Sequence, residues 1–288
     1  MKSVQIQLTT KCNQKCIMCR KYTWPHKEIS IDLLLKKLEE YKEATFTFSG
    51  GDPLDYTELS KLNEYLKKNN VVYQVFTNLT YEMNEERKEF LDNAKWIQVS
   101  LDGYDRETYY DIRRQNGFDD LILNQSMFEN IKFNCVISSE NYKSLSKIAK
   151  LGYNINKKVR FFPVHTHENL MIGKKIEESV KEQIEHLKKY NKEIYNNTNL
   201  SNFFEQKNIP KKCYVKKHHR LIDEYGHEYP CCRAINDNGY DIHQKYKVEN
   251  LDGIDDENVL YDFCKGCDRY VKFNKEWGKY ENKEELFL

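Results

Sequence analysis

The chain has 288 residues, and its 46 lysine and arginine residues nearly balance its 45 aspartate and glutamate residues. This balance gives no bulk electrostatic reason to expect a nucleic-acid partner. The chain has no apolar run long enough to span a membrane, and its start, MKSVQIQLTTKC, lacks the apolar centre of a signal peptide. We therefore expect a cytoplasmic protein without a membrane partner, whose nine cysteines bind metal or act in catalysis rather than form disulfides.

The first half of the sequence alternates short β-type runs with amphipathic helical runs. Strands are predicted at Val4–Leu8, Thr45–Phe48, Val71–Thr77, Trp96–Leu101, Ile131–Ser138 and Val159–Val164. Helices are predicted at Ile31–Tyr41, around Leu59, Leu62 and Leu66, and at Asn84–Asn93, Leu121–Asn130 and Asn141–Leu151. This order favours an α/β fold with a parallel sheet. Six units are too few for a closed eight-stranded barrel, so we expect a partial (β/α)6 barrel.

The pattern changes after about Gly173. Residues 1–175 are predicted to form the barrel, and residues 176–212 a linker that begins with the charged helix Ile176–Tyr195. Residues 213–288 are rich in turns and cysteine and poor in long helices. A segment this polar needs a metal to hold it together, so we expect a small cysteine-rich appendage.

Cys12, Cys16 and Cys19 form a C-x3-C-x2-C pattern in the loop after the first predicted strand. Iron–sulfur clusters usually take four cysteine ligands, and the next cysteine, Cys135, lies in a predicted strand. Three ligands would leave one iron of a 4Fe–4S cluster open to a small molecule. A structural zinc site with His26 as fourth ligand is the alternative.

A glycine pair follows the second predicted strand, in the run Ser49-Gly50-Gly51-Asp52-Pro53. Glycines at a strand end let the backbone approach a ligand closely. Alone, this run reads as an ordinary turn. It indicates a site because the carboxyl ends of parallel strands, where catalytic groups of such folds collect, also carry the cysteine triad.

With these features the chain resembles the radical S-adenosylmethionine superfamily over about Val4–Gly173. The triad and the glycine run are the most specific matches, although the family has glutamate where this chain has Asp52. Three later runs extend the resemblance: Thr77-Asn78-Leu79, with leucine in place of the family's glycine, Ser100-Leu101-Asp102-Gly103, and Arg113.

The resemblance implies that the triad holds a 4Fe–4S cluster whose open iron binds the amine and carboxylate of S-adenosylmethionine. It further implies cofactor contacts from Gly50, Gly51, Asp52, Pro53, Asn78, Ser100, Asp102 and Arg113. The planar fork of an arginine suits a carboxylate; a solvated helix end is the alternative reading of Arg113 and Arg114. An electron from a reduced flavodoxin- or ferredoxin-type donor would then cleave the cofactor, and the 5′-deoxyadenosyl radical would take hydrogen from a substrate.

A second group of cysteines lies near the C-terminus, with the layout C-x17-C-x32-C-x2-C. It resembles the auxiliary-cluster appendage called the twitch, a shortened SPASM domain, and implies that Cys213, Cys231, Cys264 and Cys267 hold a second 4Fe–4S cluster. A four-cysteine zinc site is the alternative. Cys232 would then be spare, and its thiol is a candidate catalytic hydrogen donor.

Three functions remain open at this stage. The chain is a radical enzyme acting on a peptide side chain or backbone, with Cys232 as hydrogen donor if the reaction is an epimerisation. It is a radical enzyme acting on a small molecule, for example an alcohol oxidised with the help of the second cluster. Or it is a zinc or iron–sulfur protein without catalytic activity, which explains the cysteines but leaves the glycine run and Ser100-Leu101-Asp102 unexplained.

Overall fold

The computed structural model describes residues 2–19, 23–164, 174–190, 215–231, 234, 246–252, 254 and 256. Its strands are β1 Ser3–Thr9, β2 Thr45–Gly50, β3 Tyr73–Thr77, β4 Trp96–Ser100, β5 Ile131–Ile137, β6 Val159–Pro163, β7 His219–Ile222 and β8 Glu228–Tyr229. They form one sheet in the order β6-β5-β4-β3-β2-β1-β7-β8.

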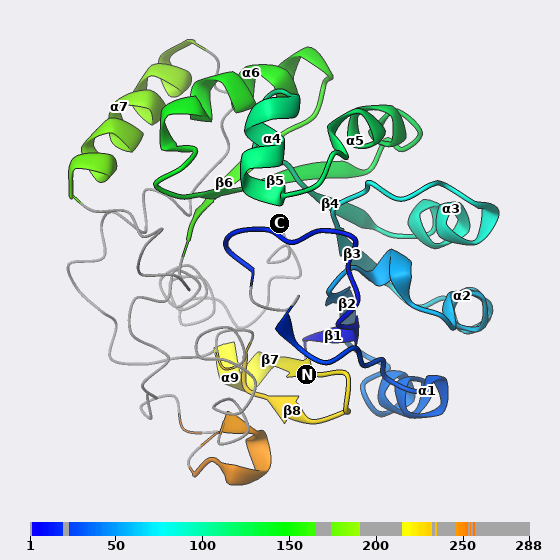
Figure 1. Ribbon diagram of the computed structural model, residues 1–288. Helices are drawn as coiled ribbons and strands as arrows, with labels where there is room; N and C mark the ends of the chain where they lie inside the picture. The colour runs from blue at the N-terminus through cyan, green and yellow to red at the C-terminus, as the bar shows by residue number, and fades with distance from the viewer. Residues whose placement is uncertain are drawn as a thin grey trace.

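Every neighbouring pair from β6 to β7 is parallel, and only β8 runs antiparallel to its neighbour β7. The sheet curves around the middle of the molecule with helices outside it (Figure 1). In the described part of the chain no pairing joins β6 to β8, so the sheet is not closed. The expected partial barrel is confirmed.

The α-helices are α1 Ile31–Glu40, α2 Leu59–Lys68, α3 Glu85–Asp92, α4 Arg106–Arg113, α5 Phe118–Gln125, α6 Leu145–Asn154, α7 Lys174–Tyr190 and α9 Val215–His218. Short 3-10 helices occur at η2 Pro53–Asp55, η3 Tyr142–Ser144 and η6 Val248–Asn250. Capping side chains start several of the helices. Ser30 Oγ accepts a hydrogen bond from the Leu33 amide before α1, and Asn84 Oδ1 accepts one from the Arg87 amide before α3.

The main hydrophobic core lies between the outer face of the sheet and the helices. Val4, Ile6 and Leu8 alternate along β1 and are fully buried with Leu34 and Leu38 of α1 in one cluster. Because successive strand residues point to opposite faces, the residues between them face the concave side. That concave side is polar: Gln5, Gln74 and Gln98 are all nearly buried there.

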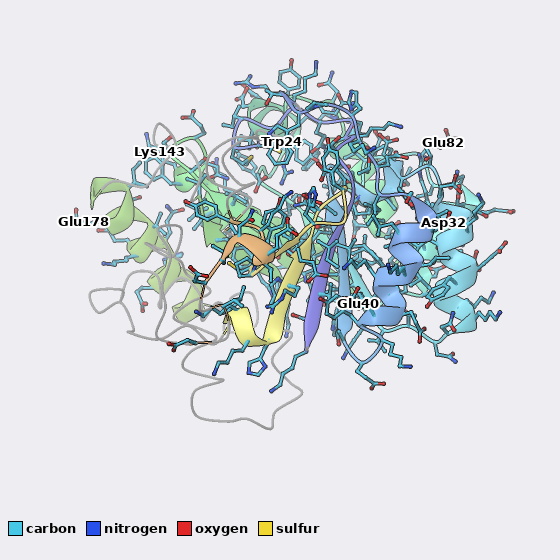
Figure 2. The ribbon with its side chains drawn as sticks, turned by 90° about the horizontal axis from the view of Figure 1, so that it is seen from below. Trp24, Asp32, Glu40, Glu82, Lys143 and Glu178 are labelled. Atoms are coloured by element: carbon cyan, nitrogen blue, oxygen red, sulfur yellow. The ribbon has the colours of Figure 1, made fainter. Side chains whose placement is uncertain are left out.

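Charged side chains gather on the outer faces of the helices (Figure 2). Asp32 and Glu40 of α1 and Glu178 of α7 are exposed. The charged helix α7 still packs by one face, since Val180 is fully buried and Gln183 Nε2 donates to the Tyr142 carbonyl at 2.6 Å. Within the described residues, no helix is both long enough and apolar enough to cross a bilayer.

Helix α4 is absent from the sequence prediction, and α5 begins three residues before its predicted start. The apolar residues of α4 are too few for a clear periodic pattern. Its start is instead marked by a capping box, in which Asp105 accepts a hydrogen bond from the Thr108 amide at 2.9 Å.

Strand β7 was also not predicted, because it is only four residues long and lies in a basic run. It pairs with β1 from Ser3↔His219 to Ile6↔Ile222, so the described start of the expected appendage continues the barrel sheet. The β7–β8 hairpin is fixed to α1, where Lys37 Nζ and Tyr41 OH both donate to Glu228, at 2.5 and 2.7 Å. The domain boundaries after residues 175 and 212 stay predictions.

Candidate functional site

The loop that carries Cys12, Cys16 and Cys19 leaves β1 at the carboxyl rim of the sheet and is held by the end of α4. The Lys15 amide donates to the Arg113 carbonyl at 3.3 Å, and the Ile17 amide to the Ile112 carbonyl at 2.9 Å. These carbonyls are left without intrahelical partners at a helix C-terminus. The last turn of α4 therefore serves as the docking surface for the cysteine loop.

Burial and nearby thiols disfavour ionisation of Cys12 and Cys16. Burial raises the pKa of Cys12 to about 12, with further increases from Asp52, Cys16 and Cys19. Burial also raises the pKa of Cys16, although nearby Arg113 opposes this. A positive centre beside these buried thiols would favour their thiolate forms, and thiolate ligands select soft metal centres.

The spacing of these donors bears on the kind of centre. Among the described residues, no three cysteine, histidine or acidic side chains are gathered closely enough to hold a single metal ion. Around one zinc ion, with Zn–S bonds of about 2.3 Å, two thiolates lie only about 3.8 Å apart. In a 4Fe–4S cluster each cysteine binds a different iron, so the sulfur atoms stand farther apart. Three thiol donors are of the kind that iron–sulfur clusters take as ligands, so the donor set fits such a cluster.

The glycine pair after β2 packs directly against the backbone that leads into Cys12. A Cβ atom at Gly50, where φ is +143°, would lie 2.3 Å from the Thr9 carbonyl oxygen, and one at Gly51 would lie 2.0 Å from the Lys11 carbonyl oxygen. The Gly51 amide donates to Thr9 O at 2.6 Å, and the Asp52 amide to Lys11 O at 2.8 Å. Glycine is thus required here to position the cysteine loop, whatever ligand the run also contacts.

Asp52 joins this turn to the end of β3. Its Oδ1 accepts from the Leu54 amide at 3.0 Å and its Oδ2 from the Asn78 amide at 2.7 Å, while the Thr77 hydroxyl donates to the same carboxyl group. Burial raises the pKa of Asp52 to about 6, and these hydrogen bonds oppose the rise. Pro53, at the start of η2, is buried beside it.

Asn78 connects that turn to the cysteine loop. Its Nδ2 lies 3.6 Å from Cys12 Sγ and donates to Asn13 Oδ1 at 2.8 Å. The next residue, Leu79, has φ of +58° and is fully buried. Leucine thus occupies the left-handed conformation that glycine adopts without strain, and burial of its side chain stabilises that arrangement.

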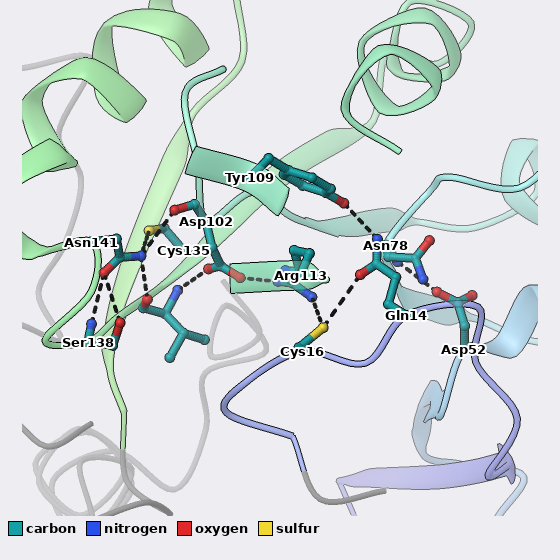
Figure 3. Close-up of polar contacts among 11 residues, drawn as sticks. Gln14, Cys16, Asp52, Asn78, Asp102, Tyr109, Arg113, Cys135, Ser138 and Asn141 are labelled. Carbon is teal, nitrogen blue, oxygen red and sulfur yellow. Dashed lines mark hydrogen bonds and ion pairs between the residues drawn. The ribbon is translucent and has the colours of Figure 1, made fainter. Parts of the chain in front are cut away.

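Asp102 and Arg113 form a buried ion pair beside Cys16 (Figure 3). The other carboxylate oxygen of Asp102 accepts from the Val136 amide at 2.6 Å, and Arg113 Nη1 lies 3.5 Å from Cys16 Sγ. Burial disfavours the charge on Arg113, but Asp102 and Cys16 raise its pKa well above the ordinary value. Arg113 Nε is buried and has no hydrogen-bond partner among the residues that the structure describes, so this N–H group is not engaged there.

Ser100 closes β4 at the same rim and is half-buried. Its side chain makes no hydrogen bond to the part of the chain that the structure describes. Strand register places it opposite Asn134 of β5, on the concave face. The rim thus brings together the residues at the ends of β1, β2, β3 and β4 that the sequence singled out.

Supporting residues in the cysteine loop escaped the sequence analysis. Gln14 Nε2 donates to the Tyr109 hydroxyl at 2.8 Å, and its Oε1 lies 3.6 Å from Cys16 Sγ. The Asn13 amide donates to the Tyr81 hydroxyl at 2.9 Å. No sequence signal marks Gln14 or Tyr81, whereas the capping box would have placed Tyr109 on a helix.

Of the predicted second ligand set, only Cys231 lies within the described residues. It follows β8 and packs partly buried beside Leu221 and Tyr229. Cys213, Cys264 and Cys267, and the candidate hydrogen donor Cys232, lie outside the described residues.

Comparison with known proteins bears on the barrel. The family model described as the Radical SAM superfamily matches residues 6–152. No curated protein sequence matches the chain. The solved structure "Native anSMEcpe with bound AdoMet and Cp18Cys peptide" is similar with a TM-score of 0.68 and 17% identity, over 93% of this chain and 88% of that one.

A second group of similar structures comes from Streptococcus suis. SuiB bound to S-adenosylmethionine gives a TM-score of 0.66 at 13% identity, over 88% of this chain and 66% of that one. SuiB bound to the precursor peptide SuiA gives a TM-score of 0.65 at 14% identity, over 90% of this chain and 66% of that one. At these identities the likeness establishes the fold.

Proposed function

The chain belongs to the radical S-adenosylmethionine superfamily, and we propose that it is an enzyme that reductively cleaves this cofactor and abstracts hydrogen from a peptide. The observation that carries the proposal is the docking of the cysteine loop on α4. That docking sets the Cys16 thiol beside the charged Arg113, and the backbone that leads into Cys12 lies against Gly50 and Gly51.

Each rim residue has a role in this proposal. Cys12, Cys16 and Cys19 hold a 4Fe–4S cluster, and a reduced flavodoxin- or ferredoxin-type protein is the proposed electron donor. When bound, the cluster and S-adenosylmethionine supply the electron transfer and the 5′-deoxyadenosyl radical.

The neighbouring residues bind and orient the cofactor. Gly50 and Gly51 keep the backbone close to the site, and Asp52, Pro53 and Asn78 fix the two turns around it. The unengaged Nε of Arg113 is directed by the Asp102 ion pair and supplies a donor for the cofactor carboxylate. Ser100, whose hydroxyl is not engaged in the described part of the chain, offers a further hydrogen bond from β4.

A peptide substrate is favoured over a small molecule because the similar structures include complexes of anSMEcpe with a Cp18Cys peptide and of SuiB with the precursor peptide SuiA. An auxiliary 4Fe–4S cluster on Cys213, Cys231, Cys264 and Cys267 would accept an electron in an oxidation. The alternatives keep the same barrel chemistry: dehydrogenation of a small-molecule alcohol, or peptide epimerisation with Cys232 as hydrogen donor.

The experiment starts from protein reconstituted anaerobically with iron and sulfide. We expect about four iron atoms per chain from the triad, or about eight with the auxiliary cluster, and release of 5′-deoxyadenosine from S-adenosylmethionine when dithionite is added. Tightly bound zinc without iron, and no 5′-deoxyadenosine, would support the remaining alternative, a zinc-binding protein without catalytic activity.

A further inference from the structure

The barrel strands have an unusual charge distribution. Strands β1 to β6 contain no aspartate or glutamate residue, yet they contain Lys132 in β5 and Arg160 in β6. Neither cation has an ion-pair partner among the residues that the structure describes. A charged group that loses water without gaining a counterion is destabilised, so an uncompensated pair needs an explanation.

Strand register places both cations on the concave face. Arg160 lies opposite Asn134, and Lys132 lies opposite Gln98. Asn134 Nδ2 donates to Gln98 Oε1 at 3.0 Å, and Gln98 Nε2 donates to Gln74 Oε1 at 2.7 Å. The two cations therefore lie next to this row of side-chain amides, on the inner face of the barrel and not on the outer face that the helices cover.

The surroundings of Lys132 hold it in place without neutralising it. Its Nζ lies 3.2 Å from the centre of the Trp96 ring, which attracts a cation through the π face. Burial lowers the pKa of Lys132 to about 8, and the like charges of Arg160, Lys158 and Lys95 add to this. Burial also lowers the pKa of Arg160.

We infer that Arg160 and Lys132 form an oxyanion site inside the barrel that binds a carboxylate or phosphate group of the substrate. A guanidinium fork and an ammonium group together match the oxygen atoms of such a group. A bound oxyanion would supply the counterion that β1 to β6 lack.

The position suits a substrate that also reaches the cofactor. Ser100, Asn134 and Arg160 lie side by side in register on β4, β5 and β6. At ordinary strand spacing Arg160 is therefore about 10 Å from Ser100, the rim residue proposed to contact the cofactor. The identification of the anion as part of a substrate rests on the proposed function, whereas the anion site itself does not.

The test is competitive trace acetylation of the full-length holoenzyme with acetic anhydride, a neutral reagent, followed by mass spectrometry. The acetylation rate of Lys132 is measured against pH and normalised to Lys88, which is exposed on α3. Samples contain sodium chloride, inorganic phosphate or glutarate at about 10 mM and equal ionic strength, the range expected for a fragment of a substrate.

We expect phosphate or glutarate to raise the midpoint of Lys132 labelling by about one pH unit. At pH 8 this slows the labelling of Lys132 about fivefold and leaves Lys88 unchanged. Protection by phosphate alone indicates a phosphorylated substrate, and protection by glutarate alone indicates a carboxylate. Arg160→Gln should abolish the protection, and Arg160→Lys should retain part of it; the lysine variant serves if the glutamine variant does not fold.

The inference is overturned if neither anion protects Lys132 beyond the chloride control. It is also overturned if S-adenosylmethionine alone protects Lys132, because the cations would then serve the cofactor carboxylate. The release of 5′-deoxyadenosine is measured on the same preparation. If 5′-deoxyadenosine is released but neither anion protects Lys132, only this inference is wrong. If an anion protects Lys132 but no 5′-deoxyadenosine is released, only the proposed function is wrong.

Discussion

Two buried carboxylates at the same rim are stabilised in opposite ways. Asp52 follows β2 and is held by backbone amides and the Thr77 hydroxyl, all neutral donors. Asp102 follows β4 and is held by the Arg113 guanidinium. Both are almost fully buried. One carboxylate therefore joins two turns, whereas the other fixes a positive charge beside the cysteine loop.

The difference makes the cysteine loop electrostatically uneven. Asp52 raises the pKa of Cys12, whereas Arg113 opposes the burial that raises the pKa of Cys16. Replacing one carboxylate at a time should separate a structural role from an electrostatic one.

The largest loss is expected for Asp102→Asn, because it leaves Arg113 buried without its counterion. We expect the free energy of unfolding to fall by about 3–5 kcal/mol, measured by urea denaturation of the holoenzyme. Asp119→Asn is the matched control, since Asp119 pairs with Arg106 at an exposed site and should cost at most about 1 kcal/mol. Equal losses in both variants would contradict a special role for the buried pair.

Gly51→Ala should disturb the cysteine loop, because the new Cβ would overlap the Lys11 carbonyl oxygen. We expect a loss of about 1–3 kcal/mol and a reduced iron content per chain. Gly152→Ala is the control, since its Cβ would crowd Val159 far from the rim. If both variants retain iron equally well, the glycine run does not position the loop.

Asp52→Asn tests the carboxyl group that is held by neutral hydrogen-bond donors. An asparagine amide can accept from only one of the Leu54 and Asn78 amides, so we expect a loss of about 1–3 kcal/mol at pH 5. The pH dependence has a definite sign. Since the folded-state pKa of about 6 exceeds that of the unfolded chain, about 3.9, the contribution of Asp52 to stability falls as pH rises from about 4 to 7.

In Asp52→Asn the decrease in the free energy of unfolding that Asp52 causes should be absent, as measured by urea denaturation across this pH range. Asp92→Asn, at the exposed end of α3, serves as control and should keep the wild-type profile. A profile for Asp52→Asn that is parallel to wild type would show that Asp52 does not titrate as described.

The smallest effect is expected for Thr77→Val, which removes one donor to Asp52 at nearly constant volume. Its hydroxyl also accepts from the Leu79 amide at 3.0 Å, so we expect a loss of about 1–2 kcal/mol. Thr77→Ser keeps the hydroxyl and should recover most of that stability. No recovery would assign the loss to packing of the methyl group.

The sequence predicted the barrel strands because their outer residues alternate with polar ones, as in Val4, Ile6 and Leu8 of β1. The rim residues could be found for the same reason, since strand ends in a parallel sheet meet at one edge. The two carboxylates could not be told apart in this way. Which cation or amide reaches a buried carboxylate depends on tertiary contacts that spacing does not encode.

Helix α4 shows where local signals were too weak. Its capping box at Asp105 and Thr108 is readable in the sequence, but its apolar residues form no long stripe. A solvated helix end was the alternative reading of Arg113, whereas the residue ends α4 with its side chain buried. Its pairing with Asp102 was not expected. Strand β7 was missed for a related reason. Its four residues lie in a basic run and form a strand only because they pair with the edge of β1.

The central claim is that a cluster held by the cysteine loop on α4 cleaves S-adenosylmethionine. The most direct test is to measure 5′-deoxyadenosine release by the Cys16→Ala variant. Cys135→Ala is the matched control, because Cys135 is buried in β5 beside Asn141. The wild type and Cys135→Ala should release 5′-deoxyadenosine when dithionite is added, and Cys16→Ala should release none. Release that persists in Cys16→Ala at the wild-type rate would contradict the account.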